Sequence, residues 1–322
     1  MARNLEALLP LVDEFGPARI AFCTDDRDPE DIADDGHING MVRKAVTAGT
    51  TPENALLLAS FHPALWHGLP RHGAIGPGYL ADLLVLPDLA SFVPEVVLKR
   101  GRPLDQVARA EVPDWVRQSV RIRPVTASDL AIPSSGGDVR VIGLVPDQVI
   151  TESLVAAPAV EGGLAVADPS CDLVKIAVVE RHLGTGRVGL GFVSGSGLQR
   201  GALASTVAHD AHNLVVIGVS DRDMAFAVER LADLGGGIVA VESMGVLAEL
   251  PLPIAGLLSD APLADVIARS RSCNEAAHAL GWTGATPFLT LSFLALSVIP
   301  HLKITDRGLV DVDRFQIVPL EV

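Results

Sequence analysis

"LVVIGVSDRDMAFAVERLADLGGGIVAVES", residues 214–243, combines two apolar runs with a helical pattern between them. Ser220 and Asp223 have the spacing of a capping box, which predicts that a helix begins at this point. Three apolar residues then recur at helical spacing, namely Met224, Val228 and Leu231. The three consecutive glycines that follow predict the end of the helix. A strand, a helix and a strand of these lengths indicate a right-handed crossover and a partly parallel sheet.

The same half of the chain contains further predicted strands. "VKIAVVERH" (174–182) and "GLGFVSG" (189–195) are apolar runs on either side of the turn "LGTGR". The glycines of "ERHLGTG" (180–186) are not followed by the Gly-Lys-Ser/Thr of a phosphate-binding loop, so a β-turn is favoured. "KITDRGLVD" (303–311) predicts a turn between strands with paired charges. Residues 105–165 are weakly patterned and predict a connection with short strands.

The N-terminal part of the chain is predicted to be mainly helical, with one early strand. Residues 4–15 predict an amphipathic helix, and residues 18–23 predict a short buried strand. A second helix is predicted at 37–49, and Thr51 before Pro52 marks the start of a third. Strands with Gly and Pro turns are then predicted within residues 73–88 and 95–104. Strands and helices alternate in both halves, which predicts an α/β fold.

Composition and charge exclude several classes of protein. The net charge of −14 over 322 residues argues against a nucleic-acid backbone or an anionic membrane surface as partner. The three cysteines are far apart, which fits a reducing cytoplasm without a disulfide framework. The N-terminus has no pattern of a signal peptide. "PFLTLSFLALSVIP" (287–300) is too short for a membrane span and predicts a buried core segment.

Two sets of stretches resemble known families. "FCTDDRDPEDIADDGHINGMVRKAVTAGTTPENALLLASFHPALWHGL" (22–69) and "GAIGPGYLADLLVL" (73–86) resemble the last strand and helices of an amidohydrolase (β/α)8 barrel running into its small β-sandwich. The second set resembles the C-terminal domain of the bacterial adenine deaminase family. It comprises "VVERHLGTGRVGLGFVSGSGLQRGALASTVAHDAHNLVVIGVSDRDM" (178–224), "LPIAGLLSD" (252–260) and "PFLTLSFLALSVIPHLKITDRGLVDV" (287–312).

This resemblance implies an α/β fold with two parts. The first is the C-terminal end of a metal-dependent (β/α)8 amidohydrolase barrel with a small β-sandwich, and the second is an α/β adenine deaminase C-terminal domain. The implied segments are the barrel end (1–72), the β-sandwich segment (73–108), a connecting segment (109–165) and the C-terminal domain (166–322). The chain would then begin just before the last barrel strand of a longer enzyme, and whether Met1 is the true start stays open.

"IAFCTDDRDPED" (20–31) ends an apolar run in two carboxylates, Asp25 and Asp26. From the spacing alone, a cap of the next helix or turn is favoured, because aspartate is a common capping residue. The resemblance implies that Asp25 instead coordinates one metal of a pair, takes a proton from the attacking water and passes it to the departing ammonia. The attacked atom would be C6 of adenine, and the product would be hypoxanthine.

The sequence lacks the other metal ligands of an amidohydrolase. None of the nine histidines forms the His-x-His of the first barrel strand. The chain by itself is therefore expected to hold little catalytic metal and to be inactive. In a complete enzyme, carboxylate and imidazole ligation of a divalent metal pair suits manganese or iron, with zinc as an alternative.

"AHDAHN" (208–213) is the second candidate site. The segment continues into the strand from residue 214, which predicts an extended conformation with residues three apart on opposite faces. A joint metal site from the two histidines is therefore disfavoured. Two interpretations stay open for this segment. It is either a polar turn at the mouth of a strand or a set of contacts to adenine, made by His209, Asp210, His212 and Asn213.

The resemblance thus implies an adenine deaminase of purine salvage that binds adenine, and the composition favours a cytoplasmic protein that binds neither nucleic acid nor a membrane. A homo-oligomer is expected, or assembly with a complementary N-terminal half. The alternative is a non-catalytic fragment or subunit of a split amidohydrolase, and a third is another cyclic-amide or amine hydrolase of the superfamily. The H-x-E and P-C-x-x-C motifs of cytidine-type zinc deaminases do not occur, which excludes that class.

Overall fold

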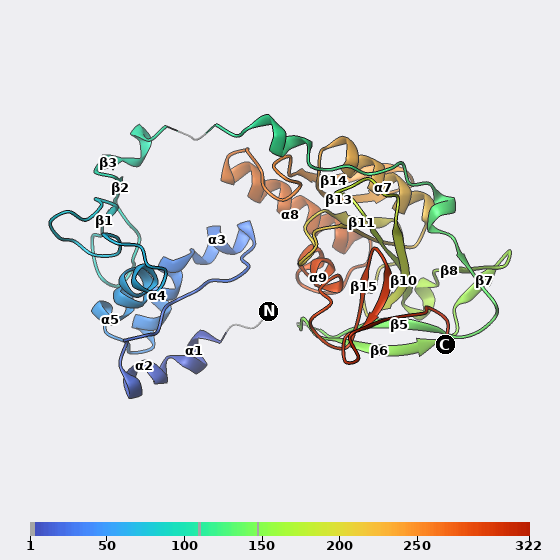
Figure 1. Cartoon of the computed structure of the whole chain (residues 1–322), viewed down its shortest axis with the longest axis horizontal. Helices are drawn as coiled ribbons and strands as arrows, with labels where there is room; N and C mark the ends of the chain where they lie inside the picture. The colour runs from blue at the N-terminus through green and yellow to red at the C-terminus, as the bar shows by residue number, and fades with distance from the viewer. Residues whose placement is uncertain (1–3, 109–110, 147) are drawn as a thin grey trace. The chain divides into compact units, whose positions relative to one another are not determined.

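Figure 1 shows the computed structural model of the chain, which describes residues 4–108, 111–146 and 148–322. Met1 and residue 109, where the connecting segment was predicted to begin, lie outside the described residues. The chain divides into two compact units, Ala2–Glu111 and Val112–Val322. They are called the N-terminal unit and the C-terminal unit.

The C-terminal unit is built on an eight-stranded mixed sheet. Its strands are β5 (Val139–Leu144), β6 (Thr151–Ala156), β9 (Leu173–Val179), β10 (Val188–Ser194), β11 (Ala202–Ser205), β12 (Leu214–Gly218), β13 (Gly237–Glu242) and β14 (Gly245–Pro251). Their order across the sheet is β14-β13-β11-β12-β9-β10-β5-β6. The sheet therefore uses strands from both sides of residue 166, and the predicted division into domains stays a prediction.

The predicted strand–helix–strand at 214–243 is present as β12, helix α7 (Asp221–Asp233) and β13. Strand β11 lies between β12 and β13 and is antiparallel to both, so these two strands run in the same direction without pairing. Strands β5 and β10 are parallel and are hydrogen-bonded to each other directly. The Ser220 hydroxyl accepts the Asp223 N–H as predicted, at 3.5 Å. The Asp223 carboxylate accepts the N–H of Met244 at 2.8 Å.

Alternation along the strands places apolar side chains on both faces of the sheet. In β9, Ile176 and Val178 lie in one buried cluster, whereas Ala177 and Val179 lie in the other. Helix α7 covers the second cluster, and helices α8 (Leu263–Ala279) and α9 (Pro287–Leu294) cover the first (Figure 1). The predicted α/β class is confirmed, with the sheet between two helical layers.

Two small sheets complete the C-terminal unit. One contains β15 (Leu302–Thr305), β16 (Gly308–Asp311) and β17 (Gln316–Val318), and the other contains β4 (Ile132–Pro133), β8 (Leu164–Val166) and β7 (Ala159–Glu161). The predicted turn within 303–311 is confirmed, because residues 305–308 join β15 to β16. This turn lies against β10, where a Cβ on Gly189 would overlap the Thr305 carbonyl.

The N-terminal unit is mainly helical. Its helices are α1 (Leu5–Leu8), α2 (Pro10–Phe15), α3 (Pro29–Asp35), α4 (Ile38–Thr47), α5 (Pro52–Leu56), a π-helical turn (Leu57–Phe61) and α6 (His62–Trp66). Its sheet contains β1 (Leu83–Val85), β2 (Val96–Lys99) and β3 (Arg102–Pro103). The helix predicted to start after Thr51 is confirmed, and the Thr51 hydroxyl accepts the Asn54 N–H at 3.3 Å. A short 3₁₀ helix, Leu104–Gln106, follows the sheet of this unit. Three more 3₁₀ helices lie in the C-terminal unit, at Asp114–Gln118, Ala127–Leu130 and Pro169–Cys171.

The strand predicted at residues 18–23 is wrong. This segment is irregular, and among the described residues no strand pairs with it. The N–H of the buried Phe22 donates instead to the carbonyl of Leu58 at 2.8 Å. An apolar run becomes a strand only where a neighbouring strand takes up its backbone hydrogen bonds. Among the described residues, no helix has the length and apolar character needed to cross a membrane.

Candidate functional site

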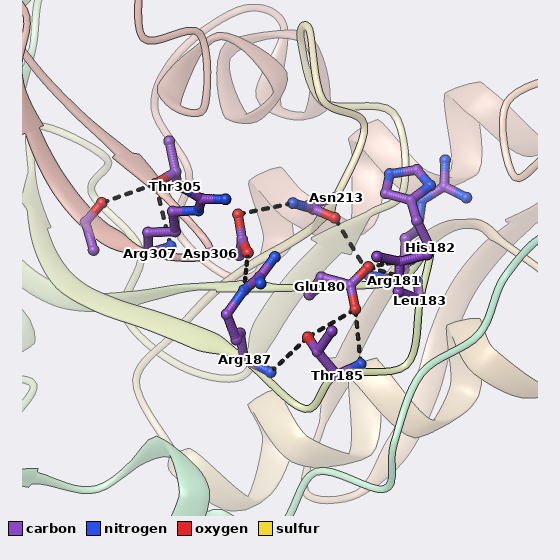
Figure 2. A network of polar contacts seen from close by, with 11 residues as sticks. Glu180, Arg181, His182, Leu183, Thr185, Arg187, Asn213, Thr305, Asp306 and Arg307 are labelled. Atoms are coloured by element: carbon purple, nitrogen blue, oxygen red, sulfur yellow. Dashed lines mark hydrogen bonds and ion pairs between the residues drawn. The ribbon is translucent and has the colours of Figure 1, made fainter.

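A polar network occupies one end of the large sheet (Figure 2). Val179, the last residue of β9, is paired with Leu214 of β12 on one side and with Val188 of β10 on the other. This register brings three segments together, because residues 180–187 follow β9 and precede β10 while residues 206–213 precede β12. The turn at 305–308 joins them from the small sheet, through Asp306.

Glu180 is the carboxylate at the centre of the loop after β9, and it is 3% exposed. It accepts the N–H groups of His182, Leu183 and Thr185 at 2.6, 2.8 and 2.9 Å, and the Thr185 hydroxyl at 2.9 Å. Burial raises the pKa of this carboxyl, but the three amides and the hydroxyl together lower it to about 2. Glu180 is therefore ionised at neutral pH and holds the loop in shape.

Arg181 and His182 connect this loop to residues 208–213, here called the histidine turn. Arg181 is 1% exposed, and its Nε donates to the His212 carbonyl while its Nη1 donates to the Ala255 carbonyl at 3.2 Å. Burial lowers the pKa of its guanidinium to about 10. His182 Nε2 donates to the Ala211 carbonyl at 2.7 Å. Two consecutive residues thus fix the backbone of the histidine turn.

Asn213 and Asp306 link the histidine turn to the small sheet. Asn213 is buried, and its Oδ1 accepts the Arg181 N–H at 3.3 Å. Its Nδ2 donates to Asp306 Oδ1 at 3.2 Å, and Arg187 Nε donates to the other oxygen of Asp306 at 2.7 Å. Both ends of the Asn213 amide are therefore used within the protein, so its predicted contact with adenine stays only a prediction.

The predicted extended conformation of the histidine turn is wrong. Residues 209–211 form a turn, and His212 has a left-handed backbone with φ 47°. This geometry brings the rings of His209 and His212 together, with centroids 5.7 Å apart, whereas the extended conformation would separate them. The His209 ring also packs on Phe293 of α9 at 4.7 Å, and Asp210 at the tip is exposed.

His212 is a neutral imidazole at physiological pH. Burial lowers its pKa, and the nearby His209 and Arg181 lower it further. Its Nδ1 accepts the N–H of Ala208 at 3.2 Å, which places the proton of the neutral ring on Nε2. The histidine turn can therefore present an N–H donor and an exposed carboxylate, the two kinds of group that pair with a purine edge.

Asp25 lies in the N-terminal unit, in the irregular segment before α3. It is exposed, has a left-handed backbone with φ 53°, and its Oδ1 accepts the N–H of Asp26 at 2.8 Å. Nearby, the Thr24 hydroxyl lies 3.1 Å from Nε2 of His37. The N-cap position of α3 is occupied by Asp28, so Asp25 does not cap that helix. In the described residues no group of three or more His, Cys, Asp or Glu side chains could hold a metal ion.

Comparison with known proteins shows the family. Residues 148–316 match the adenine deaminase C-terminal domain, and residues 1–104 match the amidohydrolase family. The chain belongs to the adenine deaminase C-terminal domain family. An adenine deaminase of Oleidesulfovibrio alaskensis is 46% identical over 318 residues, which cover 98% of this chain and 56% of that protein. Adenine deaminases of Methanothrix thermoacetophila and Brucella abortus are 46% and 45% identical, over 99% of this chain and 57% and 55% of theirs.

The resemblance to the adenine deaminase family is thus confirmed, although the chain spans only a little over half the length of these relatives. The whole polar network, from Glu180 to the turn at 305–308, lies within the adenine deaminase C-terminal domain match. Asp25 lies within the amidohydrolase match. Asp25 and the polar network therefore lie in regions that match two different domain families.

Sequence reasoning did not identify Glu180 or Asp306 as the carboxylates that organise the adenine deaminase C-terminal domain network. A signal for Glu180 exists, because a lone glutamate directly after the apolar run "IAVV" (176–179) precedes a Gly-Thr-Gly turn whose amides need acceptors. Asp306 gives no such signal, since its partners Arg187 and Asn213 are about a hundred residues away in the sequence.

Proposed function

We propose that the chain takes part in the hydrolytic deamination of adenine to hypoxanthine and ammonia. The observation that carries this proposal is the 46% identity, over 98% of the chain, to a protein named adenine deaminase. The matches to the adenine deaminase C-terminal domain and to the amidohydrolase family support it from both halves of the chain. We propose purine salvage in the cytoplasm as the pathway, because adenine and hypoxanthine are both purine bases.

Asp25 is the residue of this chain proposed to act on the reacting atoms. Its carboxylate would take a proton from the water that attacks C6 of adenine and deliver it to the departing amine, which leaves as ammonia. One of its oxygens accepts the Asp26 N–H, and the side chain is exposed, so the other oxygen can be reached from solvent. The carboxylate is also a suitable ligand for manganese, iron or zinc.

The described residues do not fit a complete metal site, because they bring no three ligating side chains together. Asp25 is therefore proposed as one ligand of a divalent metal pair, of manganese or iron with zinc as the alternative. The remaining ligands would have to come from a complementary N-terminal half, because this sequence has no His-x-His.

The test is an assay of adenine conversion with parallel metal analysis. The purified chain would be assayed alone and together with the N-terminal half of the relative from Oleidesulfovibrio alaskensis, with hypoxanthine and ammonia both measured. We expect conversion, with one mole of each product per mole of adenine, only when the second half and metal are present. A combined preparation that binds metal stoichiometrically but converts no adenine would contradict the proposal.

The histidine turn is proposed to contact the bound adenine. His209→Ala or Asp210→Ala in the combined enzyme should each lower kcat/KM about 5- to 150-fold, because a lost hydrogen bond to the base costs about 1–3 kcal/mol. Metal content should not change, since neither residue is proposed as a ligand. Steady-state kinetics and metal analysis on the same preparations check both statements.

Thr185→Val is the matched control for this prediction, because Thr185 belongs to the same polar network but lies outside the histidine turn. Its hydroxyl donates to Glu180 at 2.9 Å, so its loss should lower thermal stability and leave the kinetics unchanged. If the histidine turn is only a structural turn, His209→Ala and Asp210→Ala will behave in the same way, with reduced stability and unaltered kinetics of the folded fraction.

A further inference from the structure

The C-terminal unit contains a second candidate binding site, separate from the polar network of Figure 2. A cavity of about 510 Å³ lies along one face of α9 and is here called the α9 groove. Its walls are Leu144 at the end of β5, residues 145, 146, 148 and 149, Gly195, residues 282–286, and Leu289, Thr290 and Phe293 of α9. A volume of this size suits a small organic molecule.

Trp282 supplies the first indication of what the groove binds. The side chain is 3% exposed, and its indole Nε1 has no hydrogen-bond partner among the described residues. A buried donor without an acceptor costs about 1–3 kcal/mol, so such groups are uncommon unless a bound molecule satisfies them. The nitrogen lies against Gly284, where an added Cβ would be 3.0 Å away, and both residues line the groove.

The beginning of α9 supplies a second indication. Thr286 is the N-cap residue, but its side chain makes no capping hydrogen bond, and Pro287 occupies the first turn. The amides of the first turn have no partner within the helix, and the helix dipole places partial positive charge there. Thr286, Leu289 and Thr290 lie on the face of this turn that lines the groove. Amides and hydroxyls at a helix N-terminus favour an anionic ligand.

Lys303 supplies a third indication from behind the groove. It is fully buried, and its Nζ donates to the carbonyls of Val149 and Phe293 at 2.8 and 3.1 Å, both residues of the groove wall. Among the described residues no carboxylate pairs with this ammonium. The described lining residues include no aspartate or glutamate, although the Asp172 carboxylate accepts the N–H of Gly195 at 2.6 Å. The positive charge at this side of the groove therefore comes from the Lys303 ammonium.

We propose that the α9 groove binds a small organic anion. Its oxyanion would lie at the N-terminus of α9, within reach of the Thr286 and Thr290 hydroxyls and the Trp282 indole. Its apolar body would lie along Leu289 and Phe293. The shared chemistry is an oxyanion on an apolar or aromatic body, which a phosphate monoester or a carboxylate can supply. The groove shares Phe293 with the histidine turn, whose His209 ring packs on it at 4.7 Å. The proposal does not rest on the proposed deamination, because anion binding is measured without adenine turnover.

Calorimetric titration of the full chain tests the proposal with four probes: phenyl phosphate, benzoate, inorganic phosphate and phenol. We expect saturable binding of phenyl phosphate or benzoate at one site per chain, and the stronger of the two identifies the class of oxyanion. Inorganic phosphate should bind more weakly because it lacks the apolar body. Phenol, which lacks the charge, should bind at least tenfold more weakly than the better anion. Equal binding of phenol, or no saturable binding of either organic anion, would overturn the proposal.

Variants locate the binding in the groove. Thr286→Val and Thr290→Val preserve side-chain shape and should each weaken binding about five- to tenfold, as should Trp282→Phe. Thr47→Val, at an exposed position near the end of α4, is the matched control and should have no effect on binding. Trp66 and Trp115 are 78% and 76% exposed, so replacing both by phenylalanine leaves Trp282 as the single tryptophan, which excitation at about 295 nm selects over Tyr79. Binding that leaves Trp282 emission unchanged and is unaffected by both threonine variants would place the ligand elsewhere and refute the assignment.

Discussion

Asp25→Asn is expected to lower adenine turnover by a factor on the order of 10²–10⁴ in the chain combined with an N-terminal half, because that is the range by which a positioned proton-transfer group accelerates a reaction. The asparagine keeps the size of the side chain but has no charge and cannot accept the proton. The fold should be unaffected, since the asparagine Oδ1 can still accept the Asp26 N–H that Asp25 accepts at 2.8 Å. Initial rates of hypoxanthine formation at saturating adenine measure the effect.

Asp26→Asn is the control, because it makes the same chemical change one residue later. We expect its turnover to stay within about threefold of the wild type, the change that less than 1 kcal/mol would cause. Metal content separates the two roles of Asp25: loss of metal together with turnover indicates a ligand, and loss of turnover alone indicates a base. Full activity of Asp25→Asn would show that neither role is correct.

The segments that the sequence predicted correctly are those whose signals are local. Ser220, the apolar spacing of α7 and the glycines after it all lie within the 30 residues of the strand–helix–strand. The position of β11 between β12 and β13 has no comparable signal, since four residues of small and apolar type give little strand preference by themselves. Sheet order depends on contacts between distant segments, which one sequence does not reveal.

The two candidate sites illustrate the same limit. The histidine turn was expected to be extended because it leads into β12, but His212 takes a left-handed backbone and Arg181 holds its carbonyl from 31 residues away. The strand predicted at 18–23 failed for the opposite reason, because its apolar pattern is clear but no described strand lies beside it. A pattern gives the conformation a segment prefers, and its neighbours decide whether that conformation forms.

Glu180→Gln is expected to lower the free energy of unfolding of the C-terminal unit by about 3 kcal/mol near pH 7, because the folded pKa of about 2 lies below the ordinary value of 4.5 and each pKa unit is worth about 1.4 kcal/mol. Glutamine keeps one acceptor oxygen, but its NH₂ group would replace the second carboxylate oxygen. That oxygen accepts hydrogen bonds in the wild type, so the variant would place one donor against another. Urea unfolding measures the difference when both proteins carry phenylalanine at positions 66 and 115, so that the fluorescence reports the buried Trp282. Glu161→Gln, on exposed β7, is the matched control and should change stability by less than about 0.5 kcal/mol.

The pH dependence distinguishes this effect from a simple packing defect. A carboxyl whose pKa is lowered by folding stabilises the protein above the unfolded value, and that contribution is lost as the pH falls through the folded value. The difference between wild type and Glu180→Gln should therefore be constant above about pH 5 and fall to roughly half by pH 3, as the unfolded glutamate takes up its proton. A packing defect would give the same difference at every pH. A difference that stays at its neutral value down to pH 3 would show that the charge of Glu180 does not hold the loop of residues 180–187.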